Sequence, residues 1–278
     1  MKRCHPHGLI FPALLLFSGN LFATNDVHWT YGAGLAALTL DDYRGSHNRS
    51  SYLLPFPYLR LESRRLAIDE DGIHGRLATL PNARLEISLA AGTPVAADKN
   101  PLRQGMPDLD PSFEIGPALE FTFARTPDGK RDVVLNLPLR AVFTVSDFNI
   151  QHQGWISSPY LEYRRRFASP RPWHLGIAAG PVYADRRYHS YFYSVAPQYV
   201  LADRPVYQAT SGYSGYRLTL TLTKRIGRYW LGAFVRRDVL SGAMFTDSPL
   251  VDSSRYLAAG IALAWIIGES GHGLIDRR

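Results

Sequence analysis

Three residues in one short segment have the types found in a serine hydrolase. Asp185, His189 and Ser190 lie within six positions of each other, and such a set activates a serine hydroxyl group for attack on a carbonyl carbon. Neighbouring residues on a strand point to opposite faces, and a loop leaves their geometry unconstrained. We therefore interpret His189 as a surface residue of a loop, and we predict that the chain is not an enzyme.

Other patterns with chemical meaning are incomplete. Gly32-Ala33-Gly34 resembles part of a phosphate-binding loop, but no helix follows it. The histidines are scattered, and no group of His, Cys and carboxylate residues has the spacing of a metal site. The net charge is +7, without a block of Lys and Arg, so a nucleic-acid partner is not expected. We predict no catalytic, cofactor-binding or metal-ligating residues.

Charged residues recur at alternate positions of otherwise apolar extended segments. On the inner face of a closed sheet such charges must be paired or hydrated. Two interpretations remain open, an ion-pair network that fills the interior or a charged constriction that selects solutes. The predicted lumenal charges are Arg84, Glu86, Glu114, Glu120, Arg140, Glu162, Arg164 and Arg217.

The segment Tyr216–Arg225 shows the extended pattern most clearly. Leucines alternate with threonines along it, so a strand has one apolar and one polar face, whereas a helix would scatter the leucines. Repetition of this pattern predicts an all-β antiparallel transmembrane β-barrel, apolar outside and polar inside. The aromatic content of 12% suits girdles at the two membrane interfaces.

The pattern predicts about twelve strands, or ten if the two shortest segments do not cross the membrane. Pro55 and Pro57 predict a bulge or local widening in the second strand, because each removes a backbone donor. The predicted strands are Trp29–Leu40, Tyr52–Leu61, Arg64–Asp69, Gly72–Ala78, Arg84–Gly92, Phe113–Phe123, Asp132–Val145, Trp155–Phe167, Trp173–Ala184, Tyr216–Arg225, Tyr229–Arg237 and Tyr256–Ile267.

The connections between these strands alternate in length, and Glu70–Asp71 is the one exception. Membrane barrels have long extracellular loops and short periplasmic turns, and an even strand count leaves both termini in the periplasm. The predicted long loops are Asp41–Ser50, Thr93–Pro111, Ser146–Gly154, Asp185–Ser214 and Asp238–Ser254. The predicted short turns lie near Ser63 and at Leu80–Ala83, Arg125–Lys130, Ala168–Pro172 and Ile226–Arg228.

The two ends of the chain differ from the strands between them. Residues 1–23 combine a basic start, a short apolar run and small residues before Ala23, which predicts a signal peptide. Cys4 precedes the apolar run, so lipidation is not expected. We predict the barrel over residues 24–267 and a periplasmic tail over residues 268–278.

Tyrosines are concentrated in the loop Asp185–Ser214. They predict either self-packing of the loop over the barrel mouth or a surface that binds a partner or glycan. The residues of this predicted contact surface are Tyr188, Tyr191, Tyr193, Tyr199, Tyr207 and Tyr213.

Several segments, in this order and spacing, resemble the MipA/OmpV family of outer-membrane proteins. These segments are Asp42–Ser46, Leu54–Tyr58, Leu102–Asp110, Glu114–Gly116, Tyr191–Val195 with Tyr207, and Asp247–Val251. The resemblance covers nearly all of the chain after residue 23. It departs from the family where Ile266–Arg278 extends beyond the final aromatic residue, Trp265.

The resemblance implies a non-enzymatic protein of the bacterial outer membrane. The family's named member resembles a scaffold that brings a membrane-bound lytic transglycosylase together with a penicillin-binding murein synthase. A scaffolding or structural barrel of the cell envelope is therefore the first hypothesis, with murein hydrolase and synthase proteins and outer-membrane lipid as partners. The alternative is a narrow channel for small solutes, and an outer-membrane hydrolase ranks third.

Overall fold

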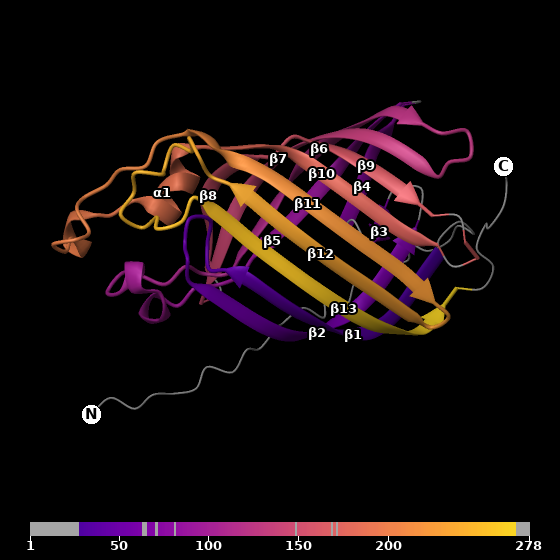
Figure 1. Ribbon diagram of the computed structural model, residues 1–278, viewed down its shortest axis with the longest axis horizontal. Coiled ribbons are helices and arrows are strands. Elements are labelled where there is room, and N and C mark those ends of the chain that lie inside the picture. Colours follow the sequence, from indigo (N-terminus) through magenta and orange to yellow (C-terminus); the bar gives the residue numbers. More distant parts are fainter. Residues whose placement is uncertain are drawn as a thin grey trace.

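The chain folds into an antiparallel sheet that closes into a barrel, with one short helix at one end (Figure 1). The computed structural model describes residues 28–62, 66–69, 72–80, 82–147, 149–167, 169–170 and 172–270. Its strands are β1 (His28–Asp41), β2 (Arg49–Glu62), β3 (Leu66–Asp69), β4 (Gly72–Thr79), β5 (Ala83–Gly92), β6 (Ser112–Arg125), β7 (Arg131–Ser146), β8 (Asn149–Ser157), β9 (Tyr160–Arg166), β10 (Trp173–Ala184), β11 (Gly212–Ile226), β12 (Tyr229–Val239) and β13 (Arg255–Glu269). Its helical segments are η1 (Ala97–Lys99), η2 (Pro101–Arg103), α1 (Arg186–Tyr193) and η3 (Pro197–Tyr199).

Pairing between the first and last strands closes the sheet. β1 and β13 are antiparallel, in a register that runs from Thr30 opposite Glu269 to Leu40 opposite Ala258. β10 and β11 pair as well, so the described strands form one closed sheet, in which the β2–β3 junction is short. A closed sheet satisfies backbone groups internally, which a membrane-spanning sheet requires. The predicted antiparallel transmembrane barrel is confirmed.

β8 and β9 are two pieces of one barrel strand. Both pair with β7 on one side and with β10 on the other. Ser158 and Pro159 separate them, and a proline cannot donate to the ladder. The thirteen segments in the described part of the chain therefore occupy twelve positions around the wall, in agreement with the predicted strand count.

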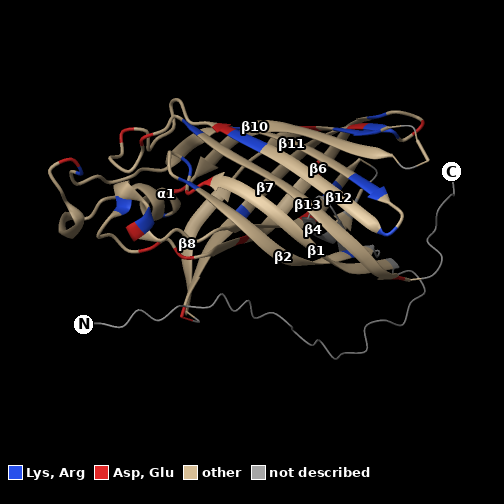
Figure 2. Ribbon diagram, turned by 60° about the horizontal axis from the view of Figure 1, so that its bottom comes forward, with Lys and Arg blue, Asp and Glu red and all other residues tan. Residues whose placement is uncertain are grey.

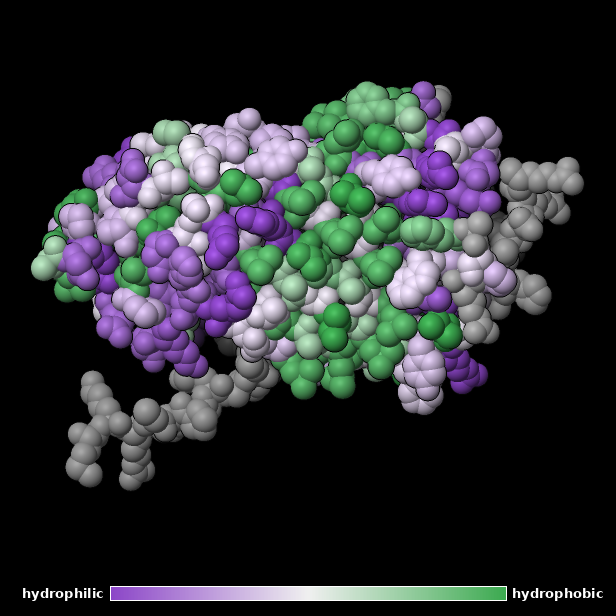
Figure 3. Space-filling view, in the orientation of Figure 1, coloured by the Kyte–Doolittle hydropathy of each residue, from purple (hydrophilic) through white to green (hydrophobic). Residues whose placement is uncertain are grey.

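The alternation predicted for Tyr216–Arg225 divides β11 between outside and inside. Leu218 and Leu220 are exposed on the outer face, whereas Thr219 and Thr221 line a cavity inside the barrel. Exposed apolar side chains of the strands form a band between two hydrophilic ends (Figure 3). An outer surface of this polarity suits contact with the acyl chains of a bilayer.

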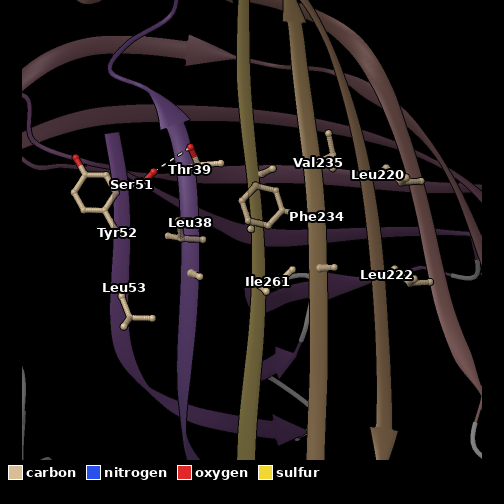
Figure 4. A pocket seen from close by; sticks show the side chains of 14 residues that line it. Leu38, Thr39, Ser51, Tyr52, Leu53, Leu220, Leu222, Phe234, Val235 and Ile261 are labelled. Carbon is tan, nitrogen blue, oxygen red and sulfur yellow. Dashed lines mark hydrogen bonds between the residues drawn. The ribbon is translucent and has the colours of Figure 1, made fainter. Parts of the chain in front are cut away.

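A hollow of about 710 Å³ interrupts this apolar band over β2, β1, β13, β12 and β11 (Figure 4). Exposed side chains such as Leu53, Leu220 and Ile261 surround smaller residues that include Ala233 and Ala259. The short side chains leave the outer surface of these strands recessed between the larger ones.

The β3–β4 hairpin is much shorter than the other strands. β3 pairs with β2 only at Leu61 and Glu62, so over residues 49–60 the described part of β2 has a hydrogen-bonded neighbour on one side alone. Pro55 and Pro57 lie in this stretch, and proline is tolerated at a strand edge. β2 pairs with β1 without a shift of register, so the predicted bulge is wrong.

The long loops and the short turns lie at opposite ends of the barrel, as predicted. The exception is the predicted loop Ser146–Gly154. β7 ends at Ser146 and β8 begins at Asn149, so most of this predicted loop is strand. Its polar residues are compatible with a hairpin that extends beyond the membrane and has both faces exposed to water. The other long extracellular loops lie at the end of the barrel that carries α1, and the short turns lie at the opposite, periplasmic end (Figure 1).

The predicted signal peptide, residues 1–23, lies outside the described residues, as do residues 271–278 of the predicted tail. β13 continues to Glu269, two residues beyond the predicted end of the barrel. There the Trp29 amide donates a hydrogen bond of 3.0 Å to the Ser270 hydroxyl group. None of the described helices is both long enough and apolar enough to cross a membrane.

Candidate functional site

Five of the predicted lumenal charges form one network near the periplasmic end. Arg84 on β5 forms ion pairs with Glu120 and, at 3.6 Å, with Glu86. The Nη2 atom of Arg164 lies 3.0 Å from Glu120 and 2.9 Å from Glu162. Glu86, Glu120 and Glu162 are all buried. Ion pairs therefore fill this part of the interior and link β5, β6 and β9.

Arg140 on β7 makes a second set of contacts, nearer the middle of the wall. Its Nε atom donates to Glu114 at 2.8 Å, and its Nη1 atom donates to the Ser88 hydroxyl group at 3.1 Å. Its Nη2 atom lies 3.3 Å from the Ser158 hydroxyl group. Charge balance and three hydrogen-bonded partners hold this guanidinium group in one position.

The upper cluster is a third group of charges, close to the extracellular loops, in which three arginines surround one carboxylate. Asp238 accepts hydrogen bonds from Arg44 at 2.7 Å, from Arg236 at 2.8 and 3.0 Å, and from Arg217 at 3.3 and 3.5 Å. Arg44 also donates to the hydroxyl group of Ser214 at 2.7 Å and to its carbonyl oxygen. The side chain of Asp238 is 0% exposed.

The sequence predicts only Arg217 of this upper cluster. Asp238 is predicted to begin a loop, yet β12 continues through Asp238 to Val239. The available signal was that Phe234, Arg236 and Asp238 occupy alternate positions on the inner face. Continuing this alternation places Asp238 within the strand, beyond its predicted end at Arg237. Arg44 comes from a loop and has no comparable signal.

Four long loops pack together over the extracellular mouth, and we call this assembly the loop cap. It comprises residues 42–48, 93–111, 185–211 and 240–254. The rings of Tyr193 and Phe245 stack with centroids 3.8 Å apart, and the Tyr193 hydroxyl group donates to the Arg44 carbonyl oxygen at 2.8 Å. The buried apolar core of the cap is Tyr43, Val95, Leu109, Tyr193, Ala209, Leu240, Ala243 and Phe245.

His189 is fully buried in the loop cap, so its prediction as a surface residue is wrong. Its Nδ1 atom lies 2.6 Å from the Thr210 carbonyl oxygen, and its Nε2 atom lies 3.1 Å from the Ser214 hydroxyl group. The eight-residue helix α1 turns this side chain inward and packs it on Phe245. Burial lowers the pKa of His189 below its usual value of 6.5, since a low dielectric disfavours the charged form.

Two of the six tyrosines in the predicted contact surface are buried, and the other four are half-buried. Tyr188 and Tyr193 are buried, so for these two the predicted role as an exposed contact surface is wrong. The Tyr191 hydroxyl group accepts a hydrogen bond from the Asp110 amide at 2.8 Å, and the Tyr207 hydroxyl group donates to the Met244 carbonyl oxygen at 3.2 Å. Their rings therefore fasten the loops to one another.

Tyr199 and Tyr213 are half-buried. Tyr213 makes an edge contact with Tyr183 of β10, with ring centroids 5.9 Å apart. Self-packing of the loop, one of the two predicted alternatives, thus accounts for most of its tyrosines.

Burial also raises the pKa of several cap tyrosines. It raises the pKa of Tyr191 to about 12, and it also raises the pKa of Tyr43 and Tyr193 well above the usual value for a phenol. These phenols stay protonated over the physiological range, because the apolar surroundings disfavour the phenolate. They can therefore act as hydrogen-bond donors within the cap.

Three interior cavities lie between the loop cap and the periplasmic turns. The upper cavity, of about 310 Å³, and the middle cavity, of about 260 Å³, share Arg140 and Arg217. The middle cavity and the lower cavity, of about 240 Å³, share Glu162, Arg164 and Thr221. Neighbouring cavities therefore have lining residues in common. The middle and lower cavities lie along the inner face of β9, β10 and β11, and Arg217 of β11 also lines the upper one.

The residues that suggested a hydrolase do not assemble into a triad. Asp185 is the N-cap of α1, where its carboxylate accepts from the Tyr188 amide at 2.8 Å. His189 instead contacts Ser214, and both of these side chains are 0% exposed. The described residues also include no cluster of His, Cys, Asp and Glu that could hold a metal ion.

Two comparisons with known proteins concern sequence and one concerns structure. The model of the family described as MltA-interacting protein MipA matches residues 33–267. No curated protein matches the chain. Among solved structures, the chain is similar to the toluene transporter TodX of Pseudomonas putida, with 13% identity, coverage of 88% of this chain and 68% of that one, and a TM-score of 0.27.

Two further structures are similar at the same level. A deltaS2S3 mutant of the monoaromatic hydrocarbon channel TodX has 13% identity, coverage of 88% and 68%, and a TM-score of 0.27. The toluene transporter TbuX of Ralstonia pickettii has 8% identity, coverage of 86% and 72%, and a TM-score of 0.24. Backbones that superpose this poorly carry no argument about what the present chain binds or transports.

The family match spans most of the chain and all but the ends of the barrel. The closed wall, the apolar outer band and the extracellular loops are those of a bacterial outer-membrane protein. The predicted resemblance and location are confirmed: this chain is an outer-membrane β-barrel protein that belongs to the MipA family.

Proposed function

We propose that this barrel is a structural and scaffolding protein of the cell envelope, without catalytic activity, that binds murein enzymes at its periplasmic end. The observation that carries the proposal is the packed loop cap over the extracellular mouth. Fully buried side chains of three different loops, Tyr193, Leu240 and Leu109 among them, meet in its core. Loops that pack around a shared core at the mouth favour a structural role over an open pore for large solutes.

The periplasmic end offers a surface suited to a protein partner. Basic residues gather at the strand ends opposite α1 (Figure 2). Among the described side chains of this end they outnumber the acidic ones, which include Asp128, Asp132 and Glu269. The basic residues are Arg60, Arg125, Lys130, Arg131, Arg165, Arg166, Lys224, Arg225 and Arg228. Complementary charge steers association and fixes orientation.

The family description supports the choice of partner, because it names an interaction with MltA. We infer that a membrane-bound lytic transglycosylase binds this end of the barrel and that a penicillin-binding murein synthase joins the same assembly. Both classes of enzyme work in the periplasm, where the short turns and the ends of β1 and β13 lie.

Capture of a purified lytic transglycosylase tests the scaffold. The barrel is reconstituted in lipid nanodiscs, and binding is followed by surface plasmon resonance. Lys130→Glu with Arg131→Glu reverses two charges in a periplasmic turn, and we expect binding to weaken by about tenfold or more. The matched control reverses two exposed charges of the extracellular loop, Arg186→Glu with Arg187→Glu, and should bind as the parent does.

Equal binding by both charge-reversed proteins would contradict a periplasmic docking site. Absence of binding by the parent barrel, in the presence of the transglycosylase and synthase together, would remove the scaffold proposal.

A narrow channel for small solutes is the second candidate, favoured by the three cavities that follow one another between the loop cap and the periplasmic turns and share lining residues. The loop cap would then have to open at the mouth. Arg140 lines both the upper and the middle cavities, so its charge should dominate the local potential of a conducting lumen. Single-channel conductance that changes on Arg140→Ala would promote this candidate.

A further inference from the structure

The upper cluster has more positive than negative charge, which distinguishes it from the other lumenal charges. Three guanidinium groups share the single carboxylate of Asp238. By contrast, Arg140 is matched by Glu114, and the periplasmic network contains more glutamates than arginines. Charge that is withdrawn from bulk water is costly unless it is paired or hydrated. The cavity beside this cluster is lined by Arg44, Arg140, Arg217 and Arg236 and by the carboxylates of Asp42, Asp110 and Glu114. Four arginines against three carboxylates leave the described lining with a surplus of one positive charge, which can attract an anion.

The arginines of this cluster differ in how they face the interior. The side chains of Arg44 and Asp238 are 7% and 0% exposed, whereas those of Arg217 and Arg236 are 21% and 26% exposed. Arg217 and Arg236 lie on the adjacent strands β11 and β12, and both line the cavity of about 310 Å³. A planar guanidinium fork binds a carboxylate or phosphate group through paired hydrogen bonds. In both arginines the Nε and Nη2 atoms already donate to Asp238. An anion in the cavity would therefore bind the remaining N–H groups of Nη1 and Nη2 on the two neighbouring strands.

An apolar surface continues from these arginines along the same cavity. Phe234 precedes Arg236 by two positions on β12, so both point inward, and Leu38 and Ala258 line the cavity as well. The space above Gly260 is filled by Leu38 and Phe234, which lie where its Cβ atom would be. The apolar residues thus form a continuous patch on β1, β12 and β13.

We propose that the upper cavity binds a small amphipathic anion, with its carboxylate or phosphate group on Arg217 and Arg236 and its apolar body on Leu38 and Phe234. The cavity volume is within the range of small-molecule sites, roughly 300–1,000 Å³, in which an apolar lining is combined with a few directed polar groups. The loop cap covers the site through Tyr188, Phe192 and Tyr193, which line the same cavity. This site does not depend on whether the barrel is a scaffold or a channel.

The test compares a carboxylate with its uncharged isostere on the full-length barrel in lipid nanodiscs. The probes are 4-fluorobenzoate and 4-fluorobenzamide, observed by fluorine NMR titration with protein-free nanodiscs as the blank. We expect the carboxylate to bind at least about tenfold more tightly than the amide, since only the carboxylate makes charge-assisted hydrogen bonds. Inorganic phosphate should displace it, because the two share the oxyanion chemistry.

Variants then locate the probe within the barrel. Arg217→Gln should reduce carboxylate affinity by about tenfold and abolish the preference over the amide. Arg225→Gln makes the same change eight positions along β11, at the periplasmic end, and should leave both affinities unchanged. Phe234→Ala should weaken both probes. Heat-modifiable electrophoretic mobility shows which variants have folded.

The comparison of the two probes on the unmodified barrel keeps the test decisive even if Arg217→Gln does not fold. Equal affinity of the acid and the amide, or absence of benzoate binding at millimolar concentration, would overturn the proposal. Parent-like benzoate binding by folded Arg217→Gln would do the same. Loss of binding on Arg225→Gln would place the probe at the periplasmic turns and also reject the site.

Discussion

The Nε atom of Arg44 lies 2.7 Å from the Oδ2 atom of Asp238. This contact joins the first extracellular loop to the inner wall of β12, across 194 positions of the sequence. Asp238 holds two strand arginines at the same time, so one carboxylate connects the loop cap to the barrel. The stability of the cap and the electrostatics of the upper lumen are therefore set by the same residue.

Asp238→Asn should destabilise the folded barrel strongly. The change removes the carboxylate that Arg44, Arg217 and Arg236 share, and loss of one partner from a buried ion pair costs about 3–5 kcal/mol. Urea unfolding, followed by heat-modifiable mobility, measures the effect. Asp128→Asn removes a carboxylate from an exposed periplasmic turn and is the control. Equal midpoints for the two variants would mean that the arginines of the cluster are satisfied by water.

An arginine on the outer face of β11 should impair folding into lipid more than an arginine on its inner face. Leu220 faces outward and Thr221 faces the lumen. A lipid-facing arginine near the bilayer midplane costs about 2–4 kcal/mol, whereas a lumenal one can be hydrated. Leu220→Arg should therefore reduce the yield of barrel folded into lipid vesicles much more than Thr221→Arg does. The reverse order of yields would mean that the polar face of β11 is on the outside.

Cysteine labelling on intact cells should distinguish the two ends of the barrel. Asp203→Cys lies in the extracellular loop between β10 and β11, and Asp128→Cys lies in the periplasmic turn between β6 and β7. In a background with Cys4→Ser, a membrane-impermeant maleimide should label only the residue-203 variant, and both should react after permeabilisation. Labelling of both variants on intact cells would refute this orientation.

Acid should loosen the loop cap through His189. Its pKa is lowered by burial, so as the pH falls below about 6.5 the unfolded chain takes up a proton that the folded cap resists. The free energy of unfolding therefore falls over that range, and the contribution is fully present only above it. Thermal midpoints at about pH 7.5 and about pH 5 should differ more for the parent than for His189→Gln.

Comparison of the parent with His189→Gln isolates the contribution of His189 to the pH dependence of stability, because both proteins have the same carboxylates. Glutamine can keep hydrogen bonds to Thr210 and Ser214 without a titratable ring. If the parent and His189→Gln lose the same stability between the two pH values, the acid sensitivity belongs to other groups.

The sequence by itself determined the barrel, because a strand turns its side chains alternately to two faces. One face of each strand contacts lipid and the other contacts the polar lumen. That two-residue period is local, so Leu220 and Thr221 could be assigned to opposite faces without a structure. The inward direction of Arg84, Glu120 and Arg140 follows from the same alternation. The lengths of the connections identified the extracellular end, since long loops and short turns alternate along the chain.

Only the tertiary structure decided which charges meet and what the loops do. Arg84 and Glu120 pair because of the β5–β6 register, and a shift of one residue would reverse every side chain. Arg44 lies in a loop, where no period assigns a face, and His189 and Tyr193 lie in the short helix α1, which the sequence did not predict. Their burial depends on four loops that converge over one mouth from distant parts of the chain. Arg44 joins the strand residues Arg217 and Arg236 around Asp238 only because its loop folds over the mouth, a contact that no local pattern of residues encodes.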